Sequence, residues 1–277
     1  MKKISLILIL SCLIFNCIIF APVSAKTYKL SMLPRYFPKK IKSMIYPLSE
    51  YLSKKTGFTI QPTLTKDFAE YENSIKNGTI DIGYQNPLVY VKVSNTHTVS
   101  AMAIKGSGKN KFRGIIIARP DSGIESVRDL RHKTIMIVGK TSAGGFLSQK
   151  ITLSENGIDP DKDCVIEEAP RNKQENVIIA VSIGEADLGF IRESAFHVAD
   201  KYIRPGSIIV VTTCAWLPNW AFSMSNNLPE IVKDKITNAI LQLDKQSPVL
   251  KAMKLDGFRE TDDNAYDILR QLINTDD

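Results

Sequence analysis

The chain has 277 residues, of which 44% are hydrophobic and 23% are charged. Its 36 lysines and arginines exceed its 29 aspartates and glutamates, giving a formal charge of +7 without a long Lys/Arg run. This modest excess argues against nucleic-acid binding but would help to steer an anionic ligand to the protein. A chain of this length can bury one large core or form two domains of about 120 residues each.

The N-terminal region is typical of a secretory signal peptide. A pair of lysines precedes an uncharged apolar run over 4–21, and Val23-Ser24-Ala25 offers small residues at the cleavage positions. We expect cleavage after Ala25, so that residues 1–25 are removed and the protein is periplasmic or otherwise extracytoplasmic. An uncleaved membrane anchor and lipidation at Cys12 or Cys17 are the alternatives. No later apolar run reaches the roughly 20 residues that a membrane helix needs.

Alternating strand and helix patterns follow in two series. Short apolar or alternating runs predict strands, and apolar residues spaced three and four apart predict helices. The first series has expected strands at 28–32, 58–64, 79–83 and 99–104, with helices at 41–52, 68–77 and from 88 onward. The second has expected strand elements at 112–118, 127–130, 134–138, 164–166, 186–191 and 208–213, with helices from 141, over 175–183 and throughout the region after 228.

This order of elements predicts an α/β fold with two α/β lobes, joined by two crossing strands near 113–119 and 208–216. The first lobe is expected to comprise 26–115 and 215–277, with the terminal helices packed on it, and the second to comprise 116–214. A single sheet of about seven or eight strands is the alternative, because periodicity does not show which strands cross between lobes.

The segment 134–147 combines a buried strand with a turn that opens a helix. Apolar residues fill 135–138, hydroxyls stand at Thr141 and Ser142, and two glycines precede the apolar stripe of the helix. The first amide N–H groups of a helix lack partners within it and lie at the positive end of its dipole, so this turn suits an anion. An ordinary N-cap by Thr141 or Ser142 is the alternative.

Motifs for catalysis are missing from the sequence. It has no G-x-S-x-G or H-E-x-x-H pattern, its three histidines lack metal-ligand spacing, and serine chemistry through Ser142 would need one of them as a base. Spacing alone does not show whether Cys164 and Cys214 stay reduced or form a disulfide. We therefore expect a binding protein without a metal or cofactor, and a secreted hydrolase is the remote alternative.

Side chains suited to an oxyanion stand where strands are expected to end, which is where open α/β sheets bind ligands. The candidates are Tyr36, Tyr84, Asn86, Tyr90, Thr141, Ser142, Ala143, Gln174, Asp187 and Arg192. The alternatives are structural: the tyrosines could belong to the core, Gln174 could be a solvated helix-start residue, and Asp187 could cap a strand. Arg192 could pair with Glu193 at the surface, and the aromatic segment 216–222 could plug the junction of the lobes or line the cleft.

Five motifs resemble the phosphate/phosphite/phosphonate family of periplasmic substrate-binding proteins, and the resemblance covers nearly all of 27–274. They are D-I-G-Y-Q-N-P-L-V-Y at 81–90, K-T-S-A-G-G at 140–145, E-N-G-I-D-P at 155–160, G-E-A-D-L-G-F-I-R at 184–192 and W-L-P-N-W-A-F at 216–222. The resemblance implies a type II periplasmic-binding fold that closes on its ligand by a hinge motion and delivers the ligand to an ABC permease.

The resemblance also implies roles for single residues. Tyr90, Thr141 and Ser142 match positions that contact phosphonate or phosphite oxygens, whereas Asp187 matches only a strand-end position. Gln174 departs from the family, because transport members commonly have a histidine near this point. Arg192 and the aromatic segment look more like a branch found fused to or beside sensor proteins. The expected partners are therefore a small oxyanion and an ABC permease or, alternatively, a membrane sensor kinase or chemoreceptor, and we expect a monomer.

Overall fold

The computed structural model describes residues 26–106 and 109–273. The predicted signal peptide, its cleavage site after Ala25 and the alternative lipidation sites Cys12 and Cys17 lie outside the described residues. Within the two described ranges, every helix is too short or too polar to cross a membrane.

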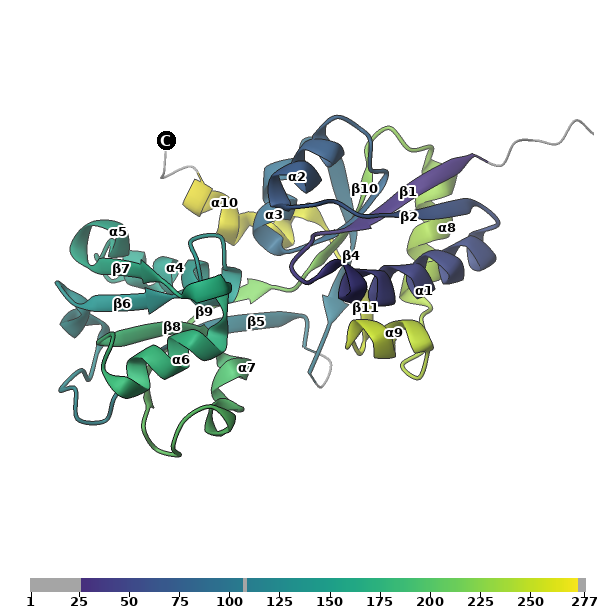
Figure 1. Cartoon of the computed structure of the whole chain (residues 1–277). Helices are drawn as coiled ribbons and strands as arrows, with labels where there is room; N and C mark the ends of the chain where they lie inside the picture. The colour runs from purple at the N-terminus through teal and green to yellow at the C-terminus, as the bar shows by residue number, and fades with distance from the viewer. Residues whose placement is uncertain (1–25, 107–108, 274–277) are drawn as a thin grey trace, which may run out of the picture.

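Two sheets form the centres of two lobes (Figure 1). The first sheet has six strands in the order β11-β4-β10-β3-β1-β2, and the second has five in the order β7-β6-β8-β5-β9. The strands of the first are β1 Thr27–Met32, β2 Thr59–Thr63, β3 Ile82–Gln85, β4 His97–Ile104, β10 Ala221–Ser225 and β11 Gly257–Glu260. Those of the second are β5 Lys111–Ala118, β6 Thr134–Ile137, β7 Val165–Glu168, β8 Leu188–Arg192 and β9 Ile209–Pro218. The expected two-lobed α/β fold is confirmed, and the single-sheet alternative is wrong.

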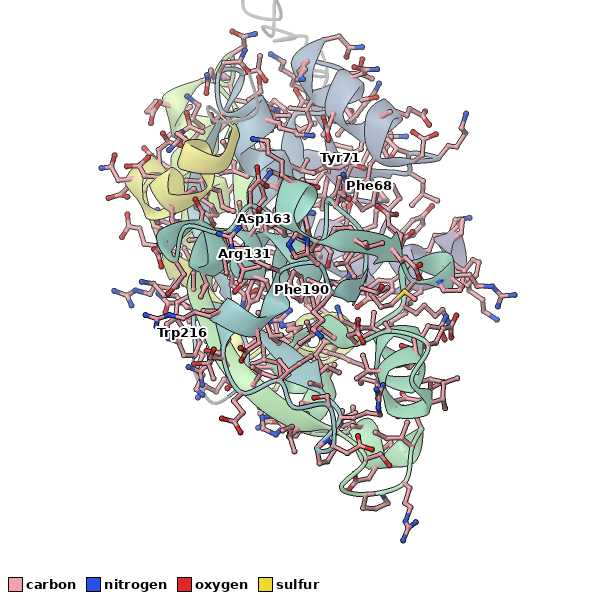
Figure 2. All side chains as sticks on the ribbon, turned by 90° about the vertical axis from the view of Figure 1, so that its left-hand side faces the viewer. Phe68, Tyr71, Arg131, Asp163, Phe190 and Trp216 are labelled. Carbon is pink, nitrogen blue, oxygen red and sulfur yellow. The ribbon has the colours of Figure 1, made fainter. Side chains whose placement is uncertain are left out.

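Helices pack around each sheet and supply the rest of its core. The first lobe has α1 Pro38–Thr56, α2 Phe68–Lys76, α3 Pro87–Val93, α8 Glu230–Leu241 and α9 Pro248–Met253, and the second has α4 Ser148–Glu155, α5 Pro160–Asp163, α6 Gln174–Ile183 and α7 Glu193–Phe196. The long helix α1 continues through Pro47 and ends at Gly57, whose φ of 77° is a left-handed conformation that glycine adopts easily. Figure 2 looks onto the second lobe, with the fully buried Phe190 inside it and the half-exposed Trp216 near its edge.

The chain crosses between the lobes twice, from β4 to β5 and from β9 to β10. β5 and β9 pair with each other over their whole length in the second sheet. The expected lobe boundaries at 115/116 and 214/215 therefore fall inside strands of the second lobe. Hydrophobic periodicity identifies a strand but not its partners, so sequence alone places such a crossing only approximately.

Three local expectations need correction. Residues 127–130 form a 3₁₀ helix, because Ser126 and Asp129 make a reciprocal capping box that starts a helical turn. The region after 228 contains a strand, β11, which pairs with β4 and is too short to show a clear alternation. The last helix, α10 Asp267–Ile273, does not pack on the first lobe alone, since Leu269 belongs to the core of the second lobe.

Both cysteines of the described chain are reduced. The Cys164 thiol donates a hydrogen bond to the Leu130 carbonyl at 3.2 Å, while Cys214 is buried in the core of the second lobe. Burial raises the pKa of Cys164 to about 11 and that of Cys214 to about 12, so both are held as unreactive thiols.

Candidate functional site: a cationic cleft between the lobes

Three cationic side chains stand at the ends of strands that face the junction of the lobes. Arg35 follows β1, Lys105 follows β4 and Arg192 ends β8. β4 and β3 both pair antiparallel with β10, so β1, β3 and β4 end at the same edge of the first sheet, and β6 and β8 end together in the second. The cations therefore stand at the carboxyl ends of both sets of parallel strands, where open α/β folds bind ligands.

Both arginines are stacked on aromatic rings. The Arg35 guanidinium carbon lies 4.7 Å from the centre of the Tyr36 ring and 4.9 Å from that of Trp220. The Arg192 guanidinium carbon lies 4.0 Å from the centre of the Phe112 ring. Stacking attracts a cation to the ring face and restricts its orientation while leaving its N–H edge able to donate.

In the described part of the chain, no carboxylate lies within 4.0 Å of the charged nitrogens of Arg35, Lys105 or Arg192. Arg113 provides the contrast, because its guanidinium bonds to Glu193 at 2.6 Å. The expected alternative of a surface pair between Arg192 and Glu193 is therefore wrong. Glu193 is committed to Arg113, and no carboxylate among the described residues forms an ion pair with Arg192.

The charges of these cations act on one another. Desolvation lowers the pKa of Arg192 to about 10, and the charge of Arg35 adds to this effect. Desolvation also lowers the pKa of Lys105, together with the charges of Arg192 and Arg35. The like charges of Arg35, Arg192 and Lys105 thus oppose one another. A bound anion would relieve this repulsion and would raise these pKa values.

The turn after β6 packs directly on Arg192. Ser142 caps the π-helical turn Ala143–Leu147 by accepting a hydrogen bond from the Gly145 N–H at 3.2 Å. A Cβ atom at Gly144 would lie only 3.1 Å from the Arg192 Cβ, so glycine is needed for this close approach. Thr141 is exposed at the start of the turn. The predicted helix-start amides thus lie beside a cation that strengthens their attraction for an anion.

Two glutamines fix the backbone that carries Arg192. The side-chain Oε1 of Gln174 accepts a hydrogen bond from the Arg192 backbone N–H at 2.8 Å. The fully buried Gln149 donates from its Nε2 to the carbonyls of Ile115, Gly144 and Ile191 at 3.0, 3.2 and 3.0 Å. These bonds tie β5, the turn and β8 together, so the Arg192 side chain projects from a rigid base.

Tyr84 forms part of the opposite wall, in the first lobe. Its ring packs 5.1 Å from that of Trp220 and 5.9 Å from that of Phe258. Its hydroxyl forms no hydrogen bond with any residue in the described ranges, although the charges of Arg35 and Arg192 act on it. Burial raises the pKa of Tyr84, which stays neutral and can donate a hydrogen bond to an anion.

A buried polar network lies next to Tyr84, around the adjacent residue Gln85. Tyr71 donates to the Gln85 Oε1 at 2.8 Å, and Gln85 donates from its Nε2 to the Ser223 hydroxyl at 2.8 Å. His97 completes the chain, with its Nδ1 at 3.2 Å from the Ser223 hydroxyl. All four side chains are fully buried, so this Ser–His contact is part of the core and is closed to a substrate.

The structure brings only some of the predicted site residues to the cleft. Tyr36, Tyr84 and Arg192 come together there, with Gln174, Thr141, Ser142 and Ala143 around the backbone of Arg192 and its neighbouring turn. The sequence analysis did not select Arg35, Lys105 or Phe112. Arg35 is adjacent to the selected Tyr36, and a cation at a predicted strand end was the available signal. Trp220 takes the role of cleft wall that was one of its two expected roles.

Tyr90 and Asn86 need correction as site residues. Tyr90 is fully buried, and the centre of its ring lies 4.7 Å from that of the Tyr266 ring. Its hydroxyl donates to the Asp263 carboxylate at 2.5 Å. The Asn86 side-chain oxygen accepts from the Val89 N–H at 2.8 Å, so it caps α3. Both side chains thus make contacts that serve the fold of the first lobe.

Asp187 also needs correction, because it lies at the wrong end of its strand. Its carboxylate accepts a hydrogen bond from the Thr134 backbone N–H at 2.9 Å, where β6 and β8 begin. Arg192 stands at the other end of β8. The first lobe repeats this contact, with Asp81 accepting from the Lys29 N–H at 2.7 Å at the start of β1 and β3. Asp187 is therefore a strand-start cap, as the structural alternative expected.

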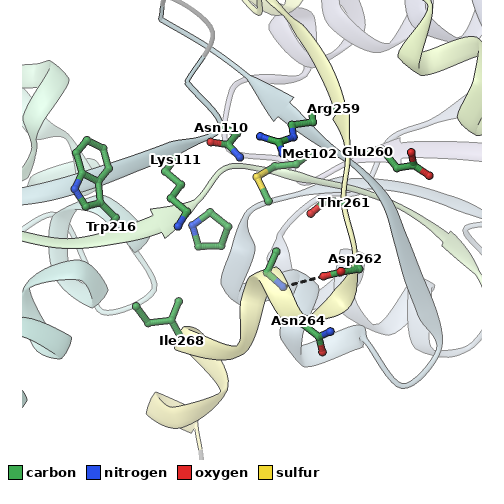
Figure 3. A pocket seen from close by; sticks show the side chains of 12 residues that line it. Met102, Asn110, Lys111, Trp216, Arg259, Glu260, Thr261, Asp262, Asn264 and Ile268 are labelled. Carbon is green, nitrogen blue, oxygen red and sulfur yellow. Dashed lines mark hydrogen bonds between the residues drawn. The ribbon is translucent and has the colours of Figure 1, made fainter.

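A separate cavity of about 450 Å³ lies beside the crossing strands (Figure 3). Its lining includes Lys111, Trp216, Arg259, Asp262 and Ile268. Cationic and anionic side chains are mixed there, and none of the three cleft cations lines it. This cavity is thus less suited to an anion than the cleft.

Comparison with known proteins identifies the family. A family model described as "ABC transporter, phosphonate, periplasmic substrate-binding protein" matches residues 30–266. The chain belongs to this family. Members of the family are extracytoplasmic binding components of transporters and are not enzymes, and the two sheets described above agree with the type II fold of its solved structures.

Relatives within and beyond transport systems are similar to the chain. The phosphate-import protein PhnD of Mycolicibacterium smegmatis is 22% identical over 250 residues, covering 86% of this chain and 77% of that protein. The tetrathionate sensor histidine kinase TtrS of Salmonella typhimurium is 23% identical over 239 residues, covering 78% of this chain but only 39% of the kinase. The solved structure of PhnD1 from Prochlorococcus marinus with methylphosphonate has a TM-score of 0.71 at 15% identity, covering 90% of this chain and 98% of that one, a likeness of fold.

Proposed function

We propose that this protein captures a small oxyanion between its two lobes outside the cytoplasm, after removal of residues 1–25, and delivers it to an ABC permease. The observation that carries the proposal is the pair Arg35 and Arg192, which reach the cleft from different lobes without a carboxylate partner in the described chain. Phosphonate-like, phosphite-like and phosphate-like anions are the first candidates, because PhnD is named for phosphate import and PhnD1 holds methylphosphonate.

The chemistry of the cleft supports binding. A guanidinium presents paired N–H donors that match two oxygens of an oxyanion, and charge-assisted hydrogen bonds of this kind are about twice as strong as neutral ones. The Tyr84 hydroxyl and the amides of the turn after Thr141 add neutral donors. Closure of the lobes would exclude water and strengthen each of these interactions.

A sensory role is the second candidate, favoured by the similarity to the tetrathionate sensor histidine kinase TtrS across 78% of this chain. The same cleft would bind the ligand in either case, and the closed form would dock on a membrane sensor in place of a permease. Uptake of the bound anion into proteoliposomes that contain the matching permease would support transport. Ligand-dependent phosphorylation of a sensor kinase without uptake would support sensing.

Binding is tested by isothermal titration calorimetry and thermal unfolding of residues 26–277 with phosphate, phosphite, methylphosphonate and sulfate at low ionic strength. A true ligand at about a hundredfold excess over its Kd should stabilise the protein by about 2.7 kcal/mol. The double variant Arg35→Gln/Arg192→Gln should lose this stabilisation. Arg128→Gln/Arg204→Gln, which removes two exposed arginines of the second lobe, is the matched control for net charge. The proposal would be contradicted if no small anion, whether compact or a longer disulfonate, stabilised the protein.

A further inference from the structure

The cleft divides its positive charge between two walls. Arg35 stands on the loop between β1 and α1 in the first lobe, and Arg192 ends β8 in the second. A site built for one tetrahedral group would gather its donors around a single point. Here the two strongest donors belong to different lobes.

Each guanidinium is held on its own wall by aromatic rings of its own lobe. Trp220, which stacks on Arg35, lies in the core of the first lobe. Phe112, which stacks on Arg192, lies in the core of the second. An arginine that moved toward the other guanidinium would leave its ring and lose the stacking interaction. The two donor groups are therefore each held by the aromatic rings of a different lobe.

The charge of the cleft also exceeds that of a monoanion. Lys105 adds a third cation at the end of β4, and among the described residues none of the three has a carboxylate within 4.0 Å. After desolvation, the charge of Arg35 helps to lower the pKa of Arg192, and the charges of Arg192 and Arg35 help to lower that of Lys105. A single negative charge would leave most of this repulsion in place, whereas two charges at separate points would offset it on both walls.

We propose that the ligand is an elongated dianion with an anionic group at each end, one bound by Arg35 and the other by Arg192, so that the ligand itself ties the two lobes together. This inference rests on the proposed function, since it assigns the ligand class of the same cleft. An end-charged dianion satisfies both guanidinium groups and supplies the attraction that closes the lobes.

Sulfonates provide a clean test, because each sulfonate group is fully ionised at neutral pH and presents the same oxygens. Calorimetry would compare methane-, ethane-, propane- and butane-disulfonate with ethanesulfonate as the matched monoanion and with sulfate, phosphate and methylphosphonate as compact anions. At equal ionic strength, the best-fitting disulfonate should bind at least about tenfold more tightly than ethanesulfonate or any compact anion, as expected from one further charge-assisted contact. It should also reduce the radius of gyration in X-ray scattering, which ethanesulfonate should not do.

Two variants assign the ends of the ligand. Arg35→Gln and Arg192→Gln should each reduce the affinity for the best disulfonate to that for ethanesulfonate, whereas Arg128→Gln should leave it within about twofold of the unmodified protein. Arg35 is exposed on its loop, so Arg35→Gln is expected to fold even if Arg192→Gln does not. In a Trp216→Phe background, Trp220 is the only remaining tryptophan of the two, and its emission should change as the disulfonate reaches Arg35.

The outcomes separate this inference from the function on which it rests. Binding of sulfate, phosphate, methylphosphonate or ethanesulfonate as tightly as any disulfonate would overturn the elongated dianion and leave oxyanion capture standing. An equal loss in Arg128→Gln would overturn it as well, because the effect would then be one of net charge. Absence of binding by every anion of the panel would overturn both.

Discussion

His97 should make the stability of the first lobe depend on pH. The ring is fully buried, with its Nε2 at 3.1 Å from the Ile80 carbonyl and its Nδ1 at 3.2 Å from the Ser223 hydroxyl. A carbonyl can only accept, so Nε2 carries the proton and the Ser223 hydroxyl donates to Nδ1. A second proton on Nδ1 would break that bond and place a charge in the core.

The size of the effect follows from the pKa. Burial lowers the pKa of His97 from 6.5 to about 4, and the desolvation of the charged ring is the main cause. Between these two values the unfolded chain binds a proton that the folded chain does not bind. The contribution of the uncharged His97 ring to stability is therefore fully present above pH 6.5, and it is lost as the pH falls toward 4. The whole loss is about 3 kcal/mol, at 1.36 kcal/mol for each pH unit.

Urea unfolding from about pH 7.5 to about pH 4.5 measures this loss in the unmodified protein and in His97→Gln. The Gln amide can still donate to Ile80 but does not titrate. The variant should be less stable by about 1–2 kcal/mol at neutral pH, because Ser223 loses its acceptor. The difference in unfolding free energy between the two proteins should shrink or reverse by about 2–3 kcal/mol toward the acid end, since carboxylates contribute equally to both.

His132→Asn is the control, because His132 is exposed and Asn tolerates its φ of 64°. It should keep the pH dependence of the unmodified protein. Parallel pH profiles for His97→Gln and the unmodified protein would refute the reasoning, since they would mean that His97 does not carry the proton-linked loss.

Three further substitutions separate structural residues from the site. Asp187→Ala should lower the unfolding free energy in urea by about 1–2 kcal/mol, because a strand-start amide loses its acceptor. Anion affinity should not change, and an affinity loss of about tenfold would show that Asp187 belongs to the site. Gly144→Ala places a methyl group 3.1 Å from the Arg192 Cβ. The anion affinity measured by calorimetry should therefore fall several fold, while the circular dichroism spectrum stays native. An unchanged affinity would show that this turn is not part of the site. Tyr90→Phe removes the hydrogen bond to Asp263 and should cost about 1–2 kcal/mol of stability with no effect on anion binding, whereas weaker binding would contradict its placement in the core.

The sequence predicts most of the elements because their signals are local. The strand and turn over 134–147 can be recognised from an apolar run followed by hydroxyls and glycines, and Arg192 from its place at a strand end. Lobe boundaries depend on which strands pair. The pairing of β5 with β9 is a contact between distant segments that leaves no periodic signal.

The candidate site is harder to predict, because it depends on which end of each strand faces the cleft and on which side chains are already occupied. Asp187 and Arg192 flank the same strand, yet only Arg192 stands at the carboxyl end. Tyr90 matches the family motif, but its hydroxyl is occupied by Asp263, which is 173 positions away in the chain. The sequence does not distinguish Arg35 from other surface arginines, because the absence of a carboxylate near it among the described residues is a property of the folded chain.

The central claim is that one anion lies between the lobes in contact with Arg35 and Arg192 together. A crystal structure of residues 26–277 with the tightest-binding anion of the panel tests this most directly. The account predicts closed lobes, with oxygens of the ligand within hydrogen-bond distance of both guanidinium groups. An anion bound by the turn after Gly139 or in the cavity beside Trp216, with the two arginines out of contact, would contradict it.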